Sequence, residues 1–122
     1  LVVEDDPAIR DIVATILGLD GYRVTEAADG EAAFDLVVEA GNSYDLLVTD
    51  IQLPGPLDGF RLARLLRERL PEPGIVCMSG DFTLDGPRPA AALPVVQLLP
   101  KPFRREGFLR TVAAAMQERI SA

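Results

Sequence analysis

The sequence of 122 residues contains no histidine, no tryptophan and one cysteine, Cys77. The absence of histidine excludes Ser-His-Asp and Cys-His mechanisms, histidine-ligated zinc, and any role as a phosphohistidine donor. A single cysteine cannot form a disulfide within the chain, and Cys77 lies in an apolar run, so we expect it in the core. This cysteine usage agrees with a reducing, cytoplasmic setting.

Positive charge is also scarce, since 12 lysines and arginines face 19 aspartates and glutamates, for a net charge of −7. This balance argues against nucleic acid as a direct partner. No apolar run approaches the roughly 20 residues that span a bilayer, so we expect no membrane segment. No signal-peptide pattern is present. The 48% hydrophobic content and 25% charge are those of an ordinary globular chain, and the length suits one domain covering residues 1–122.

Apolar runs alternate with stretches of helical periodicity along the chain. Helical spacing of apolar residues predicts helices opened by Asp6, Asp29 and Asp58 as N-caps, and a further helix after Phe103. Short apolar runs between turn residues predict strands at 1–3, 22–27, 46–49, 75–78 and 95–99. Five strands alternating with helices predict a doubly wound α/β domain with a parallel sheet.

The segment 81–94 between the last two predicted strands departs from this pattern. It carries three prolines, a glycine and little periodicity. Proline removes a backbone donor and disrupts helix interiors. We therefore expect the fourth helix of the alternation to be short or irregular.

Polar residues follow the predicted strands at their carboxyl ends. Asp5 and Asp6 end the first strand, Asp50 the third, Ser79 the fourth and Lys101 the fifth. In open parallel sheets, ligands bind beyond the carboxyl ends of the strands. We expect these five side chains to meet at one edge of the sheet.

This set of groups favours phosphoryl transfer. Three carboxylates in one crevice repel one another and need a cation, and oxygen ligands without histidine or cysteine favour Mg²⁺ over zinc. A lysine and a hydroxyl opposite them leave room for a tetrahedral anion. A carboxylate could then attack phosphorus in line while the metal ion and the lysine neutralise the phosphoryl oxygens.

Five motifs, in order along the whole chain, resemble the receiver domain of bacterial two-component response regulators. The motifs are EDD at 4–6, TDIQLPG at 49–55, DGF at 58–60, MSG at 78–80 and LPKPF at 99–103. The resemblance implies a flavodoxin-like (βα)5 fold with strand order 2-1-3-4-5. It also implies a signalling domain rather than an ordinary enzyme, although the domain would catalyse its own Mg²⁺-dependent phosphorylation and dephosphorylation.

The resemblance assigns a role to each acid. Asp50 would accept a phosphoryl group from the phosphohistidine of a histidine kinase or phosphotransfer protein. Asp6 and Asp50 would ligate Mg²⁺ directly, the backbone carbonyl of Gln52 would be a third ligand, and Asp5 would hold a metal-bound water.

The remaining roles also come from the resemblance. Ser79 and Lys101 would each bind an oxygen of the transferred phosphoryl group, and the Lys101–Pro102 peptide bond would be cis. A homodimer is possible in this family. Because 122 residues leave no room for an output domain, we expect a stand-alone receiver or one taken from a longer protein.

Several positions depart from the family pattern or stay undetermined. Leu98 replaces the Tyr or Phe that many receivers carry on the fifth strand, and leucine cannot make the inward turn of the aromatic ring that the usual switch uses. The loop after Asp50 is one residue longer than the commonest form. Gln52 and Asp81 occupy positions that tune the lifetime of the acyl phosphate, and the sequence does not fix that lifetime.

Other interpretations remain open. Taken singly, Asp6 could be only an N-cap, Ser79 only a turn residue, and Lys101 only a solvated charge. A phosphorylation-independent pseudo-receiver would act as an interaction module. A phosphatase of the haloacid dehalogenase group would need a second acid where Gln52 stands, and it would need a cap domain. A flavin-binding domain is disfavoured because the acidic first loop would repel a phosphate.

Overall fold

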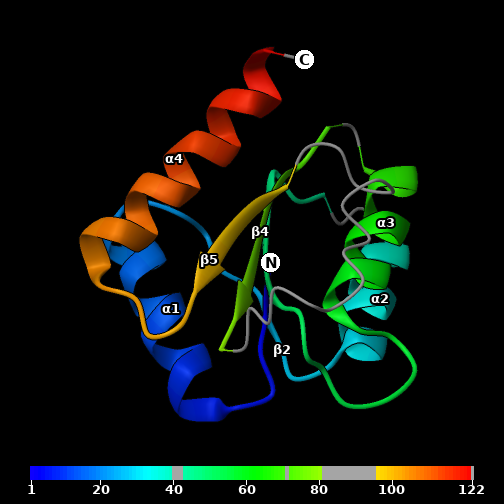
Figure 1. Cartoon of the computed structure of the whole chain (residues 1–122). Helices are drawn as coiled ribbons and strands as arrows, with labels where there is room; N and C mark the ends of the chain where they lie inside the picture. Colours follow the sequence, from blue (N-terminus) through cyan, green and yellow to red (C-terminus); the bar gives the residue numbers. More distant parts are fainter. Residues whose placement is uncertain (40–42, 71, 81–95, 122) are drawn as a thin grey trace, which may run out of the picture.

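The computed structural model describes residues 1–39, 43–70, 72–80 and 96–121, with side chains in the last helix up to Gln117. The strands are β1 (Val2–Val3), β2 (Glu26–Ala27), β3 (Leu46–Asp50), β4 (Gly74–Ser79) and β5 (Gln97–Pro100). The helices are α1 (Pro7–Leu19), α2 (Gly30–Val38), α3 (Gly59–Arg69) and α4 (Arg105–Ser121). In the described part of the chain a helix follows every strand except β4, which is followed by β5 (Figure 1).

The five strands form one parallel sheet in the order β2-β1-β3-β4-β5. This order confirms the predicted flavodoxin-like, doubly wound fold. The predicted short or irregular helix at 81–94 lies outside the described residues. No helix among the described residues is both long and apolar enough to cross a membrane.

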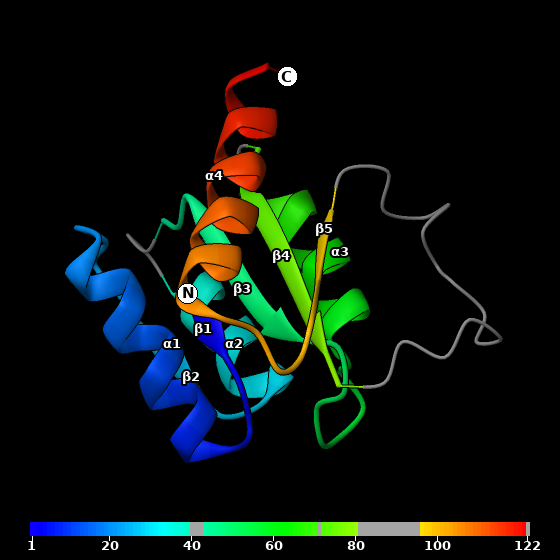
Figure 2. The ribbon, with the colours of Figure 1, turned by 60° about the vertical axis from the view of Figure 1, so that its left-hand side comes forward.

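Helices cover both faces of the sheet, with α1 and α4 on one face and α2 and α3 on the other (Figures 1 and 2). Side chains alternate along a strand, so neighbouring residues enter different cores. In β1, Val2 packs with Val13 and Phe108 from α1 and α4, whereas Val3 packs with Leu62 and other residues of α2 and α3. Burial on both faces explains why the strands read as unbroken apolar runs.

Three helices begin where the sequence predicts. The side chains of Asp6, Asp29 and Asp58 each accept a hydrogen bond from a backbone N–H in the first turn of the helix that follows. Pro7 occupies the first turn of α1, where its missing N–H costs nothing. These caps fix where the chain turns from each strand end into the next helix.

Strand boundaries differ from the predictions by a few residues. Strand β2 is shorter than the predicted 22–27, because parallel pairing with β1 covers only Glu26 and Ala27. Strands β3 and β4 each continue one residue further than predicted, to Asp50 and Ser79. Cys77 is buried in the core, as predicted. The extra residues place Asp50 and Ser79 in the sheet itself, at its carboxyl edge.

Candidate functional site

Asp50 is the last residue of β3 and is only 7% exposed. Its Oδ2 atom accepts a hydrogen bond from Lys101 Nζ at 2.8 Å, and its Oδ1 atom accepts one from the backbone N–H of Gln52 at 3.0 Å. Both carboxylate oxygens are therefore held by donors, which is how a buried carboxylate is stabilised.

Lys101 reaches Asp50 from the end of β5. Its backbone N–H donates to the carbonyl of Ser79 at 2.8 Å, which continues the β4–β5 pairing past the last strand residue. The Lys101–Pro102 peptide bond is cis, as predicted. The lysine thus begins at the sheet edge, and its side chain extends over the carboxyl ends of the central strands.

Glu4 is a second acid at this edge, and its position in the EDD motif predicted no role for it. It is fully buried, and its Oε1 atom accepts a hydrogen bond from Lys101 Nζ at 2.5 Å. Its Oε2 atom accepts one from the backbone N–H of Asp5 at 3.0 Å. Lys101 is therefore shared between Glu4 and Asp50.

Three acids lie close enough together to hold a metal ion. One carboxylate oxygen from each of Glu4, Asp5 and Asp50 lies within 4.8 Å of the others, and Asp5 is the exposed member. Carboxylate oxygens are hard ligands that suit Mg²⁺. The donor set of this cluster therefore fits the predicted cation.

Asp6 does not belong to this cluster, although the sequence predicts it as a direct metal ligand. Its Oδ1 atom accepts from the backbone N–H of Ala8 at 2.9 Å, as the N-cap of α1. Because β1 ends at Val3, Glu4 and Asp5 are the first two residues beyond the strand. Pro7 at the helix start marks Asp6 as the cap, and counting back from this proline could have identified Glu4.

Burial and neighbouring charges shift the pKa values of Glu4 and Lys101. Burial raises the pKa of the Glu4 carboxyl from its ordinary 4.5 to about 7, and the nearby Asp50 adds to this rise while Lys101 opposes it. For Lys101, burial alone would lower the pKa, but hydrogen bonds and charge from Asp50 and Glu4 outweigh burial and raise it. Lys101 is therefore a cation at neutral pH.

The comparison with protein families agrees with this geometry. Residues 1–113 match the model of the response regulator receiver domain. The chain belongs to this family. Curated relatives of the receiver domain include a positive alginate biosynthesis regulatory protein of Pseudomonas aeruginosa and the sensor kinase CckA of Brucella abortus. They are 37% and 33% identical to it and cover 94% and 97% of the chain.

Solved structures include similar domains. The receiver domain of the hybrid histidine kinase CckA superposes with a TM-score of 0.78 at 33% identity, over 95% of this chain and 96% of that one. A receiver protein from Sinorhizobium medicae superposes with a TM-score of 0.84 at 28% identity, over 97% of this chain and 93% of that one. The chain spans only 46% and 12% of the two curated relatives named above.

The other predicted site residues differ in how exposed they are. Ser79 is buried at the end of β4, and Gln52 is exposed just beyond Asp50. Leu98 on β5 is 38% exposed, and Pro102 is exposed after the cis bond. Asp81 lies outside the described residues.

Gly59 allows α3 to begin close to Asp50, a contact that the DGF motif at 58–60 did not predict. It is the first residue of α3, and its backbone N–H donates to Ile51 O at 2.8 Å. A Cβ atom there would lie 2.1 Å from the backbone oxygen of Asp50. Only glycine therefore lets α3 begin this close to the end of β3.

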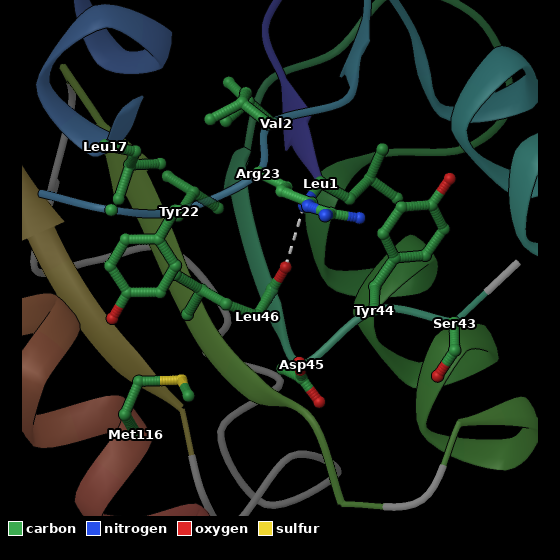
Figure 3. Close-up of a pocket in the computed structure, with 13 residues that line it drawn as sticks. Leu1, Val2, Leu17, Tyr22, Arg23, Ser43, Tyr44, Asp45, Leu46 and Met116 are labelled. Atoms are coloured by element: carbon green, nitrogen blue, oxygen red, sulfur yellow. Dashed lines mark hydrogen bonds between the residues drawn. The ribbon is translucent and has the colours of Figure 1, made fainter. Parts of the chain in front are cut away.

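A cavity of about 330 Å³ lies at the opposite, amino-terminal edge of the sheet (Figure 3). It is lined by residues at the starts of β1 and β3 and by side chains that include Tyr22, Arg23 and Met116. Figure 3 shows the hydrogen bond from the amino group of Leu1 to Leu46 O, at 2.9 Å, beside this cavity. None of the acidic cluster or Lys101 lines it, so it is separate from the receiver site.

Proposed function

We propose that this receiver domain takes a phosphoryl group onto Asp50 from the phosphohistidine of a histidine kinase or a histidine phosphotransfer protein. The observation that carries the proposal is the carboxylate of Asp50 at the sheet edge, with Lys101 at 2.8 Å and two further acids beside it. The product is a changed protein surface rather than a released compound. We infer a cytoplasmic setting, in which a phosphohistidine donor is available.

In this proposal Asp5, Asp50 and Glu4 would hold Mg²⁺, together with the backbone carbonyl of Gln52. The three carboxylates supply the hard oxygen ligands and negative charge that Mg²⁺ requires. When bound, Mg²⁺ neutralises the charge that develops on the phosphoryl oxygens. Asp6 is left to cap α1.

The transfer forms one bond and breaks one. A carboxylate oxygen of Asp50 attacks phosphorus, and a P–O bond forms as the P–N bond of the phosphohistidine breaks. The electron pair of that bond remains on the imidazole nitrogen of the donor, whose other ring nitrogen carries the proton. Lys101 exchanges its hydrogen bond with Asp50 Oδ2 for one with a phosphoryl oxygen, and the Ser79 hydroxyl donates to another.

A pseudo-receiver that acts without phosphorylation is the second candidate, because Leu98 replaces the expected aromatic residue on β5. The intact acids and Lys101 favour phosphorylation, since an interaction module has no need of a lysine shared by two buried acids. The two candidates differ in whether Asp50 gains mass.

Intact mass spectrometry tests the proposal directly. The protein and the Asp50→Asn variant are incubated with acetyl phosphate, with and without Mg²⁺. We expect a Mg²⁺-dependent gain of one phosphoryl group that the variant does not show. A folded protein that gains no mass under these conditions would contradict the proposal and favour the pseudo-receiver.

A further inference from the structure

Arg10 of α1 contacts the residue that follows β1 and a residue of β2, and so connects these three segments next to the acidic cluster. It lies in the first half of α1, and its Nη1 atom donates to the backbone carbonyl of Glu4 at 2.8 Å. Its Nε atom lies 3.6 Å from Oε1 of Glu26 on β2. The guanidinium side chain is only 23% exposed, so this is a held group rather than a free surface charge.

The contact with Glu4 matters because Glu4 follows the last residue of β1. The Glu4 N–H still donates to Ala27 O of the neighbouring strand at 3.1 Å. Its carbonyl accepts from Arg10, so both polar backbone groups of Glu4 are fixed. A fixed backbone sets the direction of the buried carboxylate that meets Lys101 at 2.5 Å.

We propose that Arg10 is a positioning residue for the metal and phosphoryl site, an inference that rests on the proposed function. It acts through the backbone of Glu4 and touches neither the phosphoryl group nor the metal ion. Glu26 of β2 also contacts the guanidinium of Arg10, and we expect it to contribute less to the positioning of Glu4. Residues that orient metal ligands without touching the metal ion typically contribute about 10- to 100-fold to metal affinity.

The direction in which Mg²⁺ affinity changes when Arg10 is replaced distinguishes a positioning role from a purely electrostatic one. A cation near three carboxylates opposes the binding of another cation. If Arg10 acted only through its charge, it would therefore weaken Mg²⁺ binding. Its removal would then tighten binding. If Arg10 instead orients Glu4, its removal weakens binding despite the gain in negative charge.

The test is a Mg²⁺ titration followed by ¹H–¹⁵N NMR at the amides of Asp5 and Gln52. We expect Arg10→Gln to raise the Kd about tenfold, and Glu26→Gln to raise it less. Arg23→Gln is the matched control, because it removes the same charge beside the cavity at the far edge of the sheet. We expect the control to bind as the unchanged protein does.

A Kd for Arg10→Gln that is unchanged or lower would overturn the inference. If that variant does not fold, as its NMR spectrum would show, Arg10→Lys carries the test. Lysine keeps the charge but cannot reach both partners, so a folded Arg10→Lys with unweakened binding would also overturn it. Failure of the unchanged protein to bind Mg²⁺ would instead reject the proposed function, and this inference with it.

Discussion

The ammonium group of Lys101 lies 2.8 Å from Oδ2 of Asp50, although the two residues are 51 positions apart in the sequence. Lys101 is the only lysine in the chain. The contact therefore joins the ends of β3 and β5 across β4 with a group that no other position supplies. A buried carboxylate without such a cation would carry a large desolvation penalty.

Because the chain has a single lysine, the pKa of Lys101 can be measured without interference from other lysines. Carbon-13 labelling of lysine gives one Cε resonance, which belongs to Lys101, and its pH titration reports the pKa of the ammonium. We expect a midpoint above the ordinary 10.5, because Asp50 and Glu4 favour the charged form. In Glu4→Gln the midpoint should fall, since one of the two carboxylates is removed. Equal midpoints in the two proteins would contradict the shared lysine.

Glu4 should give the metal-free domain a distinctive pH dependence. Its pKa is raised from 4.5 to about 7, so between these values the folded state holds a proton that the unfolded state has released. This group therefore makes the free energy of unfolding fall as pH rises through that window. Urea unfolding at several pH values should show a shallower decline in Glu4→Gln. A steeper decline in the variant would reverse the assigned sign.

The same proton should compete with the cation. Ligation requires the ionised carboxylate, so the affinity for Mg²⁺ should increase between about pH 6 and pH 8, where Glu4 loses its proton. An NMR titration at each pH measures this, and Glu4→Gln should show a weaker dependence over the same range. A pH-independent affinity would indicate that Glu4 takes no part in binding.

Much of the architecture follows from local patterns in the sequence. The alternation of apolar runs and helical spacing predicted the sheet, and three aspartates predicted three helix starts. The convergence of Asp50 and Lys101 also followed, because the carboxyl ends of parallel strands share one edge.

Other features depend on register and on contacts between distant segments. The first strand ends at Val3 as predicted, but this boundary alone does not say which of the next three acids enters the cluster. The contact of Glu4 with Lys101, 97 residues away, and the capping bond of Asp6 in α1 decide it. The close approach of Gly59 to Asp50 is a contact in space that no local pattern contains. Arg10 likewise gains its role from partners on two other segments.

Replacing Gly59 with alanine should disturb the site through the backbone alone. The added Cβ would meet the Asp50 oxygen at 2.1 Å, so the start of α3 or the end of β3 must shift. We expect clear destabilisation in thermal unfolding and slower gain of mass from acetyl phosphate. Gly18→Ala is the control, because a Cβ there meets nothing within 4 Å and alanine favours a helix by about 1 kcal/mol. Similar melting temperatures for both variants would contradict the close approach.

Asp6 and Asp5 are adjacent acids with different expected roles, and paired substitutions distinguish them. Asp6→Ala removes the N-cap of α1 and should cost about 1 kcal/mol in urea unfolding, because the N–H of Ala8 loses its acceptor. Asp6→Ser keeps a capping oxygen and should restore most of this stability, with Mg²⁺ affinity close to that of the unchanged protein. Asp5→Asn should weaken Mg²⁺ binding strongly, because it removes a charged ligand from the cluster. If Asp6→Ser weakened binding as much as Asp5→Asn does, Asp6 would have to be returned to the metal site.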